Sequence, residues 1–167
     1  DFLAQVCVAW EAAAIGAEQF GVRVVRARIA PVLSEKGGAF EALLRPFKWF
    51  VGGPIGTGKQ GFSWLHLDDQ IAALLRACDD RALKGAVNFC APEPLSNREL
   101  SQIIAELWGR PAVFKAPGFA LKALFGEGAE PLLGGQFAVP RALERAGFEF
   151  RYADVRSALT AILRAAS

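Results

Sequence analysis

The chain has 167 residues, of which 53% are hydrophobic and 22% charged, and this balance excludes intrinsic disorder and favours one globular domain or slightly more. Its 19 basic and 17 acidic side chains give a formal net charge of +2, which argues against nucleic acid as a partner. No apolar run approaches the roughly 18 residues that a membrane span requires, so we expect a soluble protein of the cytoplasm without a membrane partner. Three widely spaced cysteines and a single histidine argue against a metal centre and a disulfide framework.

The chain contains no methionine, and a helical pattern starts directly at Asp1. A chain without methionine lacks its own translational start. We therefore expect it to be the C-terminal piece of a longer protein.

The first elements follow each other in an α/β order. Apolar residues at helical spacing predict a helix over 2–19 with one buried stripe that includes Trp10, and Gly21 ends it. A β-branched stretch then predicts a strand over 22–29, with Val24 in the core. Because a helix passes directly into a strand, the sequence favours the α/β class.

The middle of the chain is rich in turn residues. Four glycines and a proline predict a tight turn over 52–58, and alternating aromatic and polar residues predict a strand over 62–67. Asp68 and Asp69 are expected to cap the helix that follows, over 69–79. The other expected helices lie at 40–47, 97–108, 119–125, 140–146 and 154–164, the other strands at 87–90 and 112–115, and the other core residues are Leu74, Ile103 and Leu159.

Four motifs occur in a fixed order along the chain. They are DFLA with WE within 1–11, GGPIGTGKQ with SWLHLDD within 52–69, VNFCAPEP at 87–94, and the stretch 140–150. In this order they resemble the C-terminal half of the epimerase-like family of atypical extended short-chain dehydrogenases/reductases, a family of the NAD-dependent epimerase/dehydratase or sugar nucleotide epimerase type. The resemblance covers essentially the whole chain.

The resemblance implies the C-terminal portion of a Rossmann-type fold, whose phosphate-binding N-terminal half is absent here. It makes 1–33 the last helix and strand of the core and 34–167 the substrate-side region. It also implies NAD or NADP as cofactor of the complete protein and a small-molecule substrate, with a nucleotide sugar as the candidate. Because Gly56 and Gly58 precede a strand and not a helix, we expect this chain alone to bind neither dinucleotide.

Reductases of this superfamily use a Tyr-x-x-x-Lys pair on the helix that here begins the chain. Aligning that helix on Glu11 puts Leu3 in the tyrosine position and Cys7 in the lysine position. Neither side chain can move a proton in that role, so no catalytic residue is assigned. We expect Cys7 to be a small core residue.

The cofactor-side candidates are Ile29, Ala30 and Pro31, at the end of the first strand. The resemblance implies that this stretch lies beside the nicotinamide, and carboxyl ends of strands are where α/β sheets bind ligands. An ordinary strand exit, in which the proline ends the ladder, is an equally weighted alternative.

The substrate-side candidates are the polar and aromatic residues around the glycine-rich turn: Lys48, Trp49, Gln60, Ser63 and His66. Glycines let a ligand approach the backbone closely, and a cation with aromatic rings can stack on a nucleotide or a sugar. The competing interpretation is a loop packed on the core, with the histidine in a structural hydrogen bond.

Two functions follow from these observations. The first is the substrate-binding half of an NAD(P)-dependent nucleotide-sugar epimerase/dehydratase-like protein, inactive in isolation. The alternative is a non-enzymatic nucleotide-sensing or protein-interaction module that presents 40–50 or 114–125 to a partner, and the missing Tyr/Lys pair favours this alternative.

Overall fold

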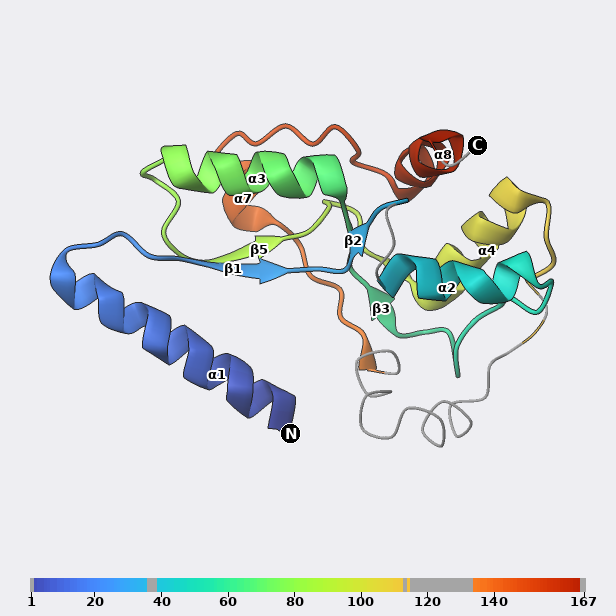
Figure 1. Cartoon of the computed structure of the whole chain (residues 1–167), viewed down its shortest axis with the longest axis horizontal. Coiled ribbons are helices and arrows are strands. Elements are labelled where there is room, and N and C mark those ends of the chain that lie inside the picture. The colour runs from blue at the N-terminus through green and yellow to red at the C-terminus, as the bar shows by residue number, and fades with distance from the viewer. Residues whose placement is uncertain (1, 36–38, 113, 115–133, 166–167) are drawn as a thin grey trace.

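The computed structural model describes residues 2–35, 39–112, 114 and 134–165, and helices and strands alternate along them (Figure 1). The α/β class expected from the sequence is confirmed. No helix within these ranges is long and apolar enough to cross a membrane.

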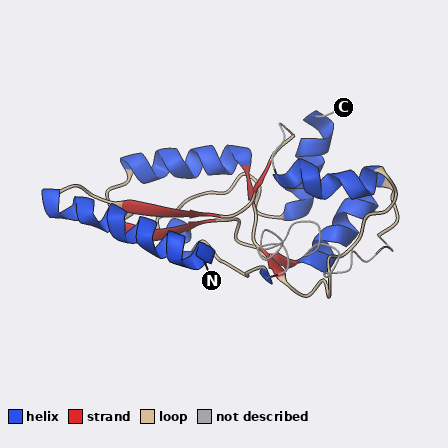
Figure 2. Cartoon of the chain, turned by 60° about the horizontal axis from the view of Figure 1, so that its bottom comes forward, coloured by secondary structure: helices blue, strands red, loops and turns tan. Residues whose placement is uncertain are grey.

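The first half of the fold is built on a pair of parallel strands. Helix α1 (Phe2–Ile15) and the 3-10 helix η1 (Gly16–Phe20) lead into β1 (Val25–Ile29), which pairs in parallel with β5 (Gly85–Phe89). Helix α3 (Leu67–Asp79) runs along one side of this pair and α1 lies on the other (Figures 1 and 2). The resulting order of helix, strands and helix is a layered α/β arrangement.

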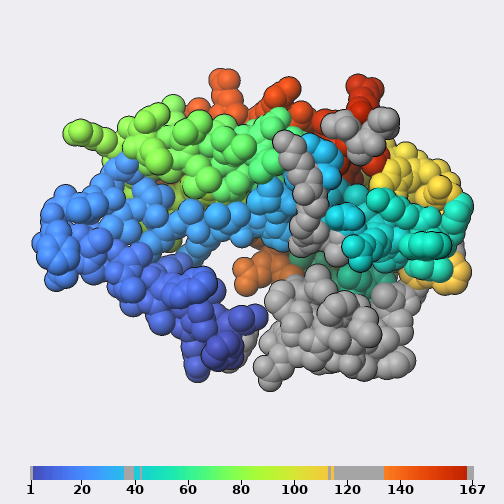
Figure 3. Space-filling view, in the orientation of Figure 1, coloured from blue at the N-terminus to red at the C-terminus, as the bar shows by residue number. Residues whose placement is uncertain are grey.

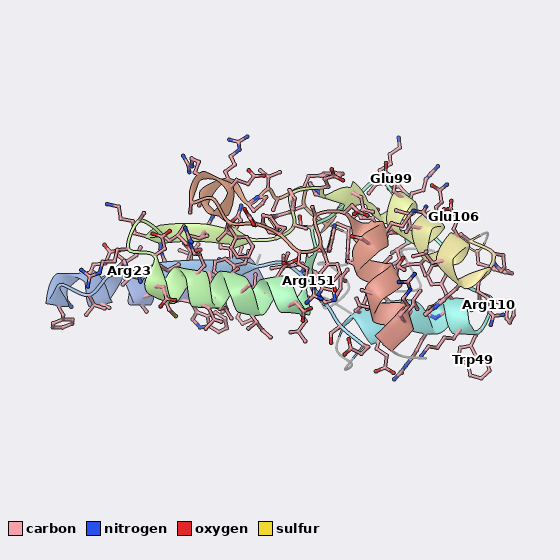
Figure 4. The ribbon with its side chains drawn as sticks, turned by 90° about the horizontal axis from the view of Figure 1, so that it is seen from above. Arg23, Trp49, Glu99, Glu106, Arg110 and Arg151 are labelled. Atoms are coloured by element: carbon pink, nitrogen blue, oxygen red, sulfur yellow. The ribbon has the colours of Figure 1, made fainter. Side chains whose placement is uncertain are left out.

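The end of α3 is held by an arginine that precedes β1. The Arg23 guanidinium donates hydrogen bonds of 2.8 Å to the carbonyls of Ala77, Cys78 and Leu83. The last carbonyls of a helix have no partner within the helix, so this side chain satisfies two of them and joins α3 to the start of β1 (Figure 4).

Short strand pairs connect this part to the rest. β2 (Val32–Leu33) pairs in parallel with β4 (Leu65–His66), and β3 (Gly61–Phe62) pairs antiparallel with β6 (Leu95–Ser96). The stretch 25–33 therefore pairs first with β5 and then with β4.

Three helices pack beyond these strands: α2 (Ala39–Lys48), α4 (Asn97–Trp108) and α8 (Val155–Ala165). The short helix α7 (Arg141–Arg145) lies against β5 instead. One cluster of buried apolar side chains joins these elements, and its largest fully buried members include Leu33, Phe47, Trp64, Leu65, Val87, Phe89, Leu100, Leu143 and Leu159.

The predicted helices that fall on described residues are confirmed, and one predicted strand needs correction. The expected strand over 62–67 is split into β3 and β4, because Ser63 leaves the ladder to bond residues 136 and 138. The two-residue strands β2 and β6 were not expected. The helix expected over 119–125 lies outside the described residues, as do two of the four residues of the strand expected over 112–115.

The expectation of a buried stripe on α1 is wrong. No residue of this helix, which lies at the surface in Figure 3, is buried, and Trp10 is 72% exposed. Leu74 is also exposed, since α3 turns Asp69, Gln70 and Ala73 inward instead. Of the other expected core residues, Leu159 is buried and both Val24 and Ile103 are half-buried.

An ion cluster attaches α1 to β1. Both oxygens of Glu11 accept hydrogen bonds, from Arg28 at 2.6 and 2.9 Å and from Arg26 at 2.8 Å. These bonds lower the pKa of the Glu11 carboxyl and keep it ionised. The helix is thus held to β1 by charge, while its apolar side chains stay open to solvent.

We expect Glu11→Gln to loosen α1 selectively. The neutral amide loses both ion pairs with Arg26 and Arg28, and no buried side chain of α1 compensates for them. Amide hydrogen exchange should become several-fold faster in α1, with β5 unchanged. Glu18→Gln is the control, since this exposed side chain forms no ion pair among the described residues; equal protection of α1 in both variants contradicts the expectation.

Candidate functional site

The carboxyl ends of the two parallel strands form the first candidate surface. Ile29 pairs with Phe89 at the end of the ladder, and the Ala30 N–H donates to the Phe89 carbonyl at 3.0 Å. The Pro31 carbonyl then accepts from the Leu65 N–H at 3.1 Å. Because Ile29 is 53% exposed, its side chain is open to a ligand at this edge.

The glycine-rich turn packs on the start of α4. The Gly58 N–H donates to the Ile55 carbonyl at 2.9 Å, and Arg98 donates to the carbonyls of Thr57 and Gly58 at 3.0 and 2.9 Å. The Gln60 side chain closes the turn by donating to the Ile55 carbonyl at 3.0 Å. The turn thus directs carbonyls at α4, which suits a tight structural turn and not a phosphate cradle.

Ser63 is buried and bonded on both sides. Its Oγ donates to the Gln136 carbonyl and accepts from the Ala138 N–H, both at 2.8 Å. The side chain therefore fastens the segment between β3 and β4 to residues 136–138.

His66 is the N-cap of α3. Its Nδ1 accepts the Asp68 N–H at 3.1 Å, and its ring centroid lies 4.0 Å from that of Tyr152. The expectation that Asp68 and Asp69 cap this helix is wrong, because the imidazole occupies that role and both carboxylates lie in the first turn.

The two carboxylates instead fasten a distant loop to α3. Asp69 is 2% exposed and accepts the backbone N–H groups of Arg151 and Tyr152 at 2.8 and 3.0 Å. Asp68 binds the Arg151 guanidinium at 3.1 Å near the surface (Figure 4). No local sequence pattern reveals this contact, since 82 residues separate Asp69 from Arg151.

Lys48 and Trp49 lie elsewhere, at the end of α2. Lys48 lines a cavity of about 380 Å³, whereas Gln60, Ser63 and His66 line neither this cavity nor a second one between α4 and the start of α8. Trp49 is 78% exposed. The structure thus does not bring the five substrate-side candidates into one cavity, and their role in substrate binding stays a prediction.

The cysteines offer no prepared nucleophile at this surface. Burial raises the pKa of the Cys90 thiol to about 11, so this thiol stays protonated and unreactive near neutral pH. Cys7 is exposed, which corrects the expectation of a core position and follows from the exposure of α1 as a whole. Among the described residues, no group of three His, Cys, Asp or Glu side chains could hold a metal ion.

We expect His66 to make stability depend on pH. Burial lowers the pKa of His66 below 6.5, against the opposing charges of Asp68, Asp69 and Glu35, and the nearby Arg151 lowers it further. As pH falls from 7.5 through 6.5, the unfolded chain binds the proton first, so the free energy of unfolding decreases until pH passes the lowered folded value.

The matched variant is His66→Asn, whose side-chain oxygen can keep the cap while it cannot titrate. Urea unfolding at pH 7.5 and 5.5 should show a smaller loss of stability in this variant than in the parent chain. An identical loss in both proteins contradicts a role of His66 in the pH dependence.

The chain is similar in sequence and in fold to known proteins. A family described as "Domain of unknown function (DUF1731)" matches residues 116–162. The chain is 42% identical over 164 residues to the chloroplastic homolog of epimerase family protein SDR39U1 from Arabidopsis thaliana, covering 98% of this chain and 47% of that protein. It is 43% identical over 159 residues to epimerase family protein MT2273 of Mycobacterium tuberculosis, covering 95% and 53%. The chain thus spans about half the length of the curated relatives it matches.

Solved structures give the same result. The crystal structure of human epimerase family protein SDR39U1 (isoform 2) with NADPH is 34% identical, with a TM-score of 0.81 over 86% of this chain and 49% of that one. The nucleoside-diphosphate sugar epimerase of Corynebacterium glutamicum is 33% identical, with a TM-score of 0.78 over 98% of this chain and 31% of that one. The dTDP-glucose 4,6-dehydratase of Bacillus anthracis, at 13% identity and a TM-score of 0.69, shares the fold. The chain is therefore similar over nearly its whole length to epimerase family proteins, which supports an epimerase-like short-chain dehydrogenase/reductase family with a Rossmann-like fold.

Proposed function

We propose that this chain is the substrate-side, C-terminal part of an NAD(P)-dependent epimerase-like protein of the atypical extended short-chain dehydrogenase/reductase type. The observation that carries the proposal is the exposed carboxyl end of the parallel pair β1–β5, in a chain that matches about half of a human protein crystallised with NADPH. In this proposal 1–33 completes the nucleotide-binding core and 34–167 forms the substrate side, in the cytoplasm.

The residues at the end of β1 fit an apolar contact to a nicotinamide. The Ala30 N–H and the Pro31 carbonyl are already bonded to β5 and β4, so they are not free to hold the carboxamide. The half-exposed Ile29 side chain is free to contact a flat ring. The dinucleotide would supply hydride transfer, and Ile29 with its two successors would position the ring and exclude water from one face.

The proton chemistry of such a reaction has no obvious source on α1. Leu3 and Cys7 take the positions at which related reductases carry tyrosine and lysine, and a leucine side chain cannot exchange a proton. A proton donor would have to come from another part of the complete protein. We propose a nucleotide sugar as the substrate class, supported by the likeness to a nucleoside-diphosphate sugar epimerase.

The other substrate-side candidates contribute differently in this proposal. Ser63 and His66 fix the strand segment and α3 behind the site, since all their described hydrogen bonds stay within the chain. Gln60 shapes the glycine-rich turn, whose surface would face the sugar.

Calorimetric titration with NADPH and NADH tests the proposal. The complete protein, including the N-terminal half that we propose precedes this chain, should bind one of the two, and this chain alone should bind neither. The described residues offer no turn of free backbone N–H groups that could hold a pyrophosphate. Micromolar binding to the chain alone contradicts the proposed division, and no binding to the complete protein contradicts the proposed cofactor.

Cys7→Ala in the complete protein tests whether the thiol takes part in the chemistry. We expect turnover of an identified substrate to stay nearly unchanged. A large fall in turnover, with the fold intact by circular dichroism, contradicts the view that Cys7 has no chemical role.

A nucleotide-sensing or protein-interaction module is the second candidate. Trp49, Phe50 and Val51 form an apolar stretch after α2 that is at least half exposed, which suits a partner surface. Binding of NADPH by the complete protein without turnover of any nucleotide sugar favours this candidate over the enzyme.

A further inference from the structure

A cavity lies apart from the strand ends and the glycine-rich turn. It has a volume of about 380 Å³ and is formed where the C-terminal ends of α4 and α8 meet α2 and the residues after β2. Figure 4 looks onto this region, where α8 crosses α2 and Trp49 and Arg110 lie near the C-terminal end of α2. The cavity is lined by Ser34, Glu35, Glu41, Leu44, Lys48, Trp108, Arg110, Ile162 and Leu163.

Two cations at this cavity have no carboxylate partner among the described residues. Lys48, at the last position of α2, forms no hydrogen bond or ion pair with them. The guanidinium of Arg110 lies 3.8 Å from the centroid of the Phe50 ring and pairs with no acid. By contrast, Glu41 on the same wall has an ion-pair partner in Arg45 at 3.9 Å.

Phe50, whose ring contacts the Arg110 guanidinium, has a strained backbone. It has a φ of 60° and is the one non-glycine residue with a positive φ in the described ranges. An aromatic residue in the left-handed region is a genuine outlier, and such strain concentrates at ligand sites. In this conformation the ring lies against the Arg110 guanidinium, and a guanidinium stacked on a ring can donate two parallel hydrogen bonds to an oxyanion from its edge.

The rest of the lining combines two polar residues, Ser34 and Glu35, with an apolar wall. Leu44 is buried in the core, Trp108 is half-buried and Ile162 is 3% exposed. A ligand held by its charged end at Lys48 and Arg110 would therefore place an apolar body against these side chains. The volume is at the small end of the range of ligand pockets, so it limits the ligand to one ring or a short chain.

We propose that this cavity binds a small phosphate monoester with an apolar body. Among the described residues the cavity has two cations without a carboxylate partner, Lys48 and Arg110, and one carboxylate without a cation partner, Glu35. The excess positive charge favours the negatively charged group of a phosphate monoester. The site is separate from the proposed cofactor and substrate surface, since of the earlier candidates only Lys48 lines it. NADPH binding therefore neither supports nor contradicts the proposal of this second site.

The probe is phenyl phosphate, titrated into the ¹⁵N-labelled full chain. The Trp108 indole and the Arg110 backbone amide should shift saturably, with the Trp108 signal assigned by Trp108→Phe. Inorganic phosphate lacks the apolar body and benzoate lacks the second charge, so both should bind more weakly. Equal affinity for inorganic phosphate overturns the apolar part of the proposal, and absence of saturable shifts at these groups overturns the site.

Charge-neutral variants test the two cations. Lys48→Gln and Arg110→Gln should each weaken binding of phenyl phosphate by about tenfold or more, as expected for the loss of one charge-assisted hydrogen bond. Lys59→Gln is the matched control, because it removes one exposed positive charge outside the cavity. Equal weakening in all three variants means general attraction to positive charge and overturns the proposal.

Phe50→Ala tests the stack independently of charge. The substitution keeps both cations but removes the ring under the Arg110 guanidinium. Binding should weaken several-fold while the spectrum of the remaining chain stays that of the folded protein. Unchanged affinity overturns the role assigned to the strained residue.

Discussion

Trp64→Ala is expected to lower the free energy of unfolding by about 4 kcal/mol, which is the usual cost of removing a buried tryptophan side chain. Trp64 is 0% exposed and lies between β3 and β4. Its indole N–H donates to the Glu93 carbonyl at 3.0 Å, and its own carbonyl accepts the Ala91 N–H at 2.6 Å. Urea unfolding at pH 7.5 measures the loss.

Two companion variants separate the causes. Trp49→Ala removes the same side chain from a position that is 78% exposed, so stability should change by less than about 0.5 kcal/mol. Trp64→Phe keeps a ring but removes the donor to Glu93, and should cost about 1–3 kcal/mol from the unsatisfied carbonyl and the smaller volume. Equal effects of the two alanine variants contradict a central place for Trp64 in the core.

Asp69→Ala is expected to have the second large effect and to lower the free energy of unfolding by about 3 kcal/mol. The carboxylate accepts the N–H groups of Arg151 and Tyr152 in a site that is 2% exposed, and each charge-assisted bond contributes roughly 1.5–3 kcal/mol before relaxation. Loss of both should also free the loop that carries Tyr152 from His66. Chemical unfolding gives the total, and amide exchange at 151 and 152 gives the local effect.

The neighbouring carboxylate is the control for this prediction. Asp68→Ala removes a salt bridge to Arg151 from a side chain that is 47% exposed, and such pairs contribute about 0–1 kcal/mol. Asp69→Asn should fall between the two alanine variants, because its amide keeps one acceptor and presents a donor to the second N–H group. A larger loss in Asp68→Ala than in Asp69→Ala contradicts the proposed anchoring.

The sequence predicted those helices and strands whose periodic pattern and end signals lie within the element itself or next to it. Helix α4 is an example, since Ser96 and Glu99 form a capping box, which is a local sequence signature, and Gly109 ends the helix at a φ of 59°. The two-residue strands β2 and β6 have no period that a sequence can show. The burial of α1 could not be predicted either, because the same apolar pattern fits a helix covered by this chain and a helix that this chain leaves exposed.

The candidate site was predictable only in part, and for the same reason. The end of β1 at Ile29 follows from the local pattern and the α/β order, whereas the cavity beside Lys48 is built from three helices that are distant in sequence. No propensity predicts a positive φ at Phe50, since an aromatic residue there is unfavourable without its surroundings. The partners of Asp69 lie more than 80 residues away and follow only from the tertiary structure.

The change of partner along 25–33 gives this protein a direct mechanical link. Ala30 is bonded to β5 and Pro31 to β4, so one peptide unit joins the two parallel pairs. β4 ends at His66 and α3 follows directly at Leu67. Asp69 in α3 then accepts the backbone N–H of Arg151, which joins α3 to that loop. A ligand that presses on Ile29 would therefore strain a continuous path of hydrogen bonds that ends on the opposite side of α3, without any hinge in between.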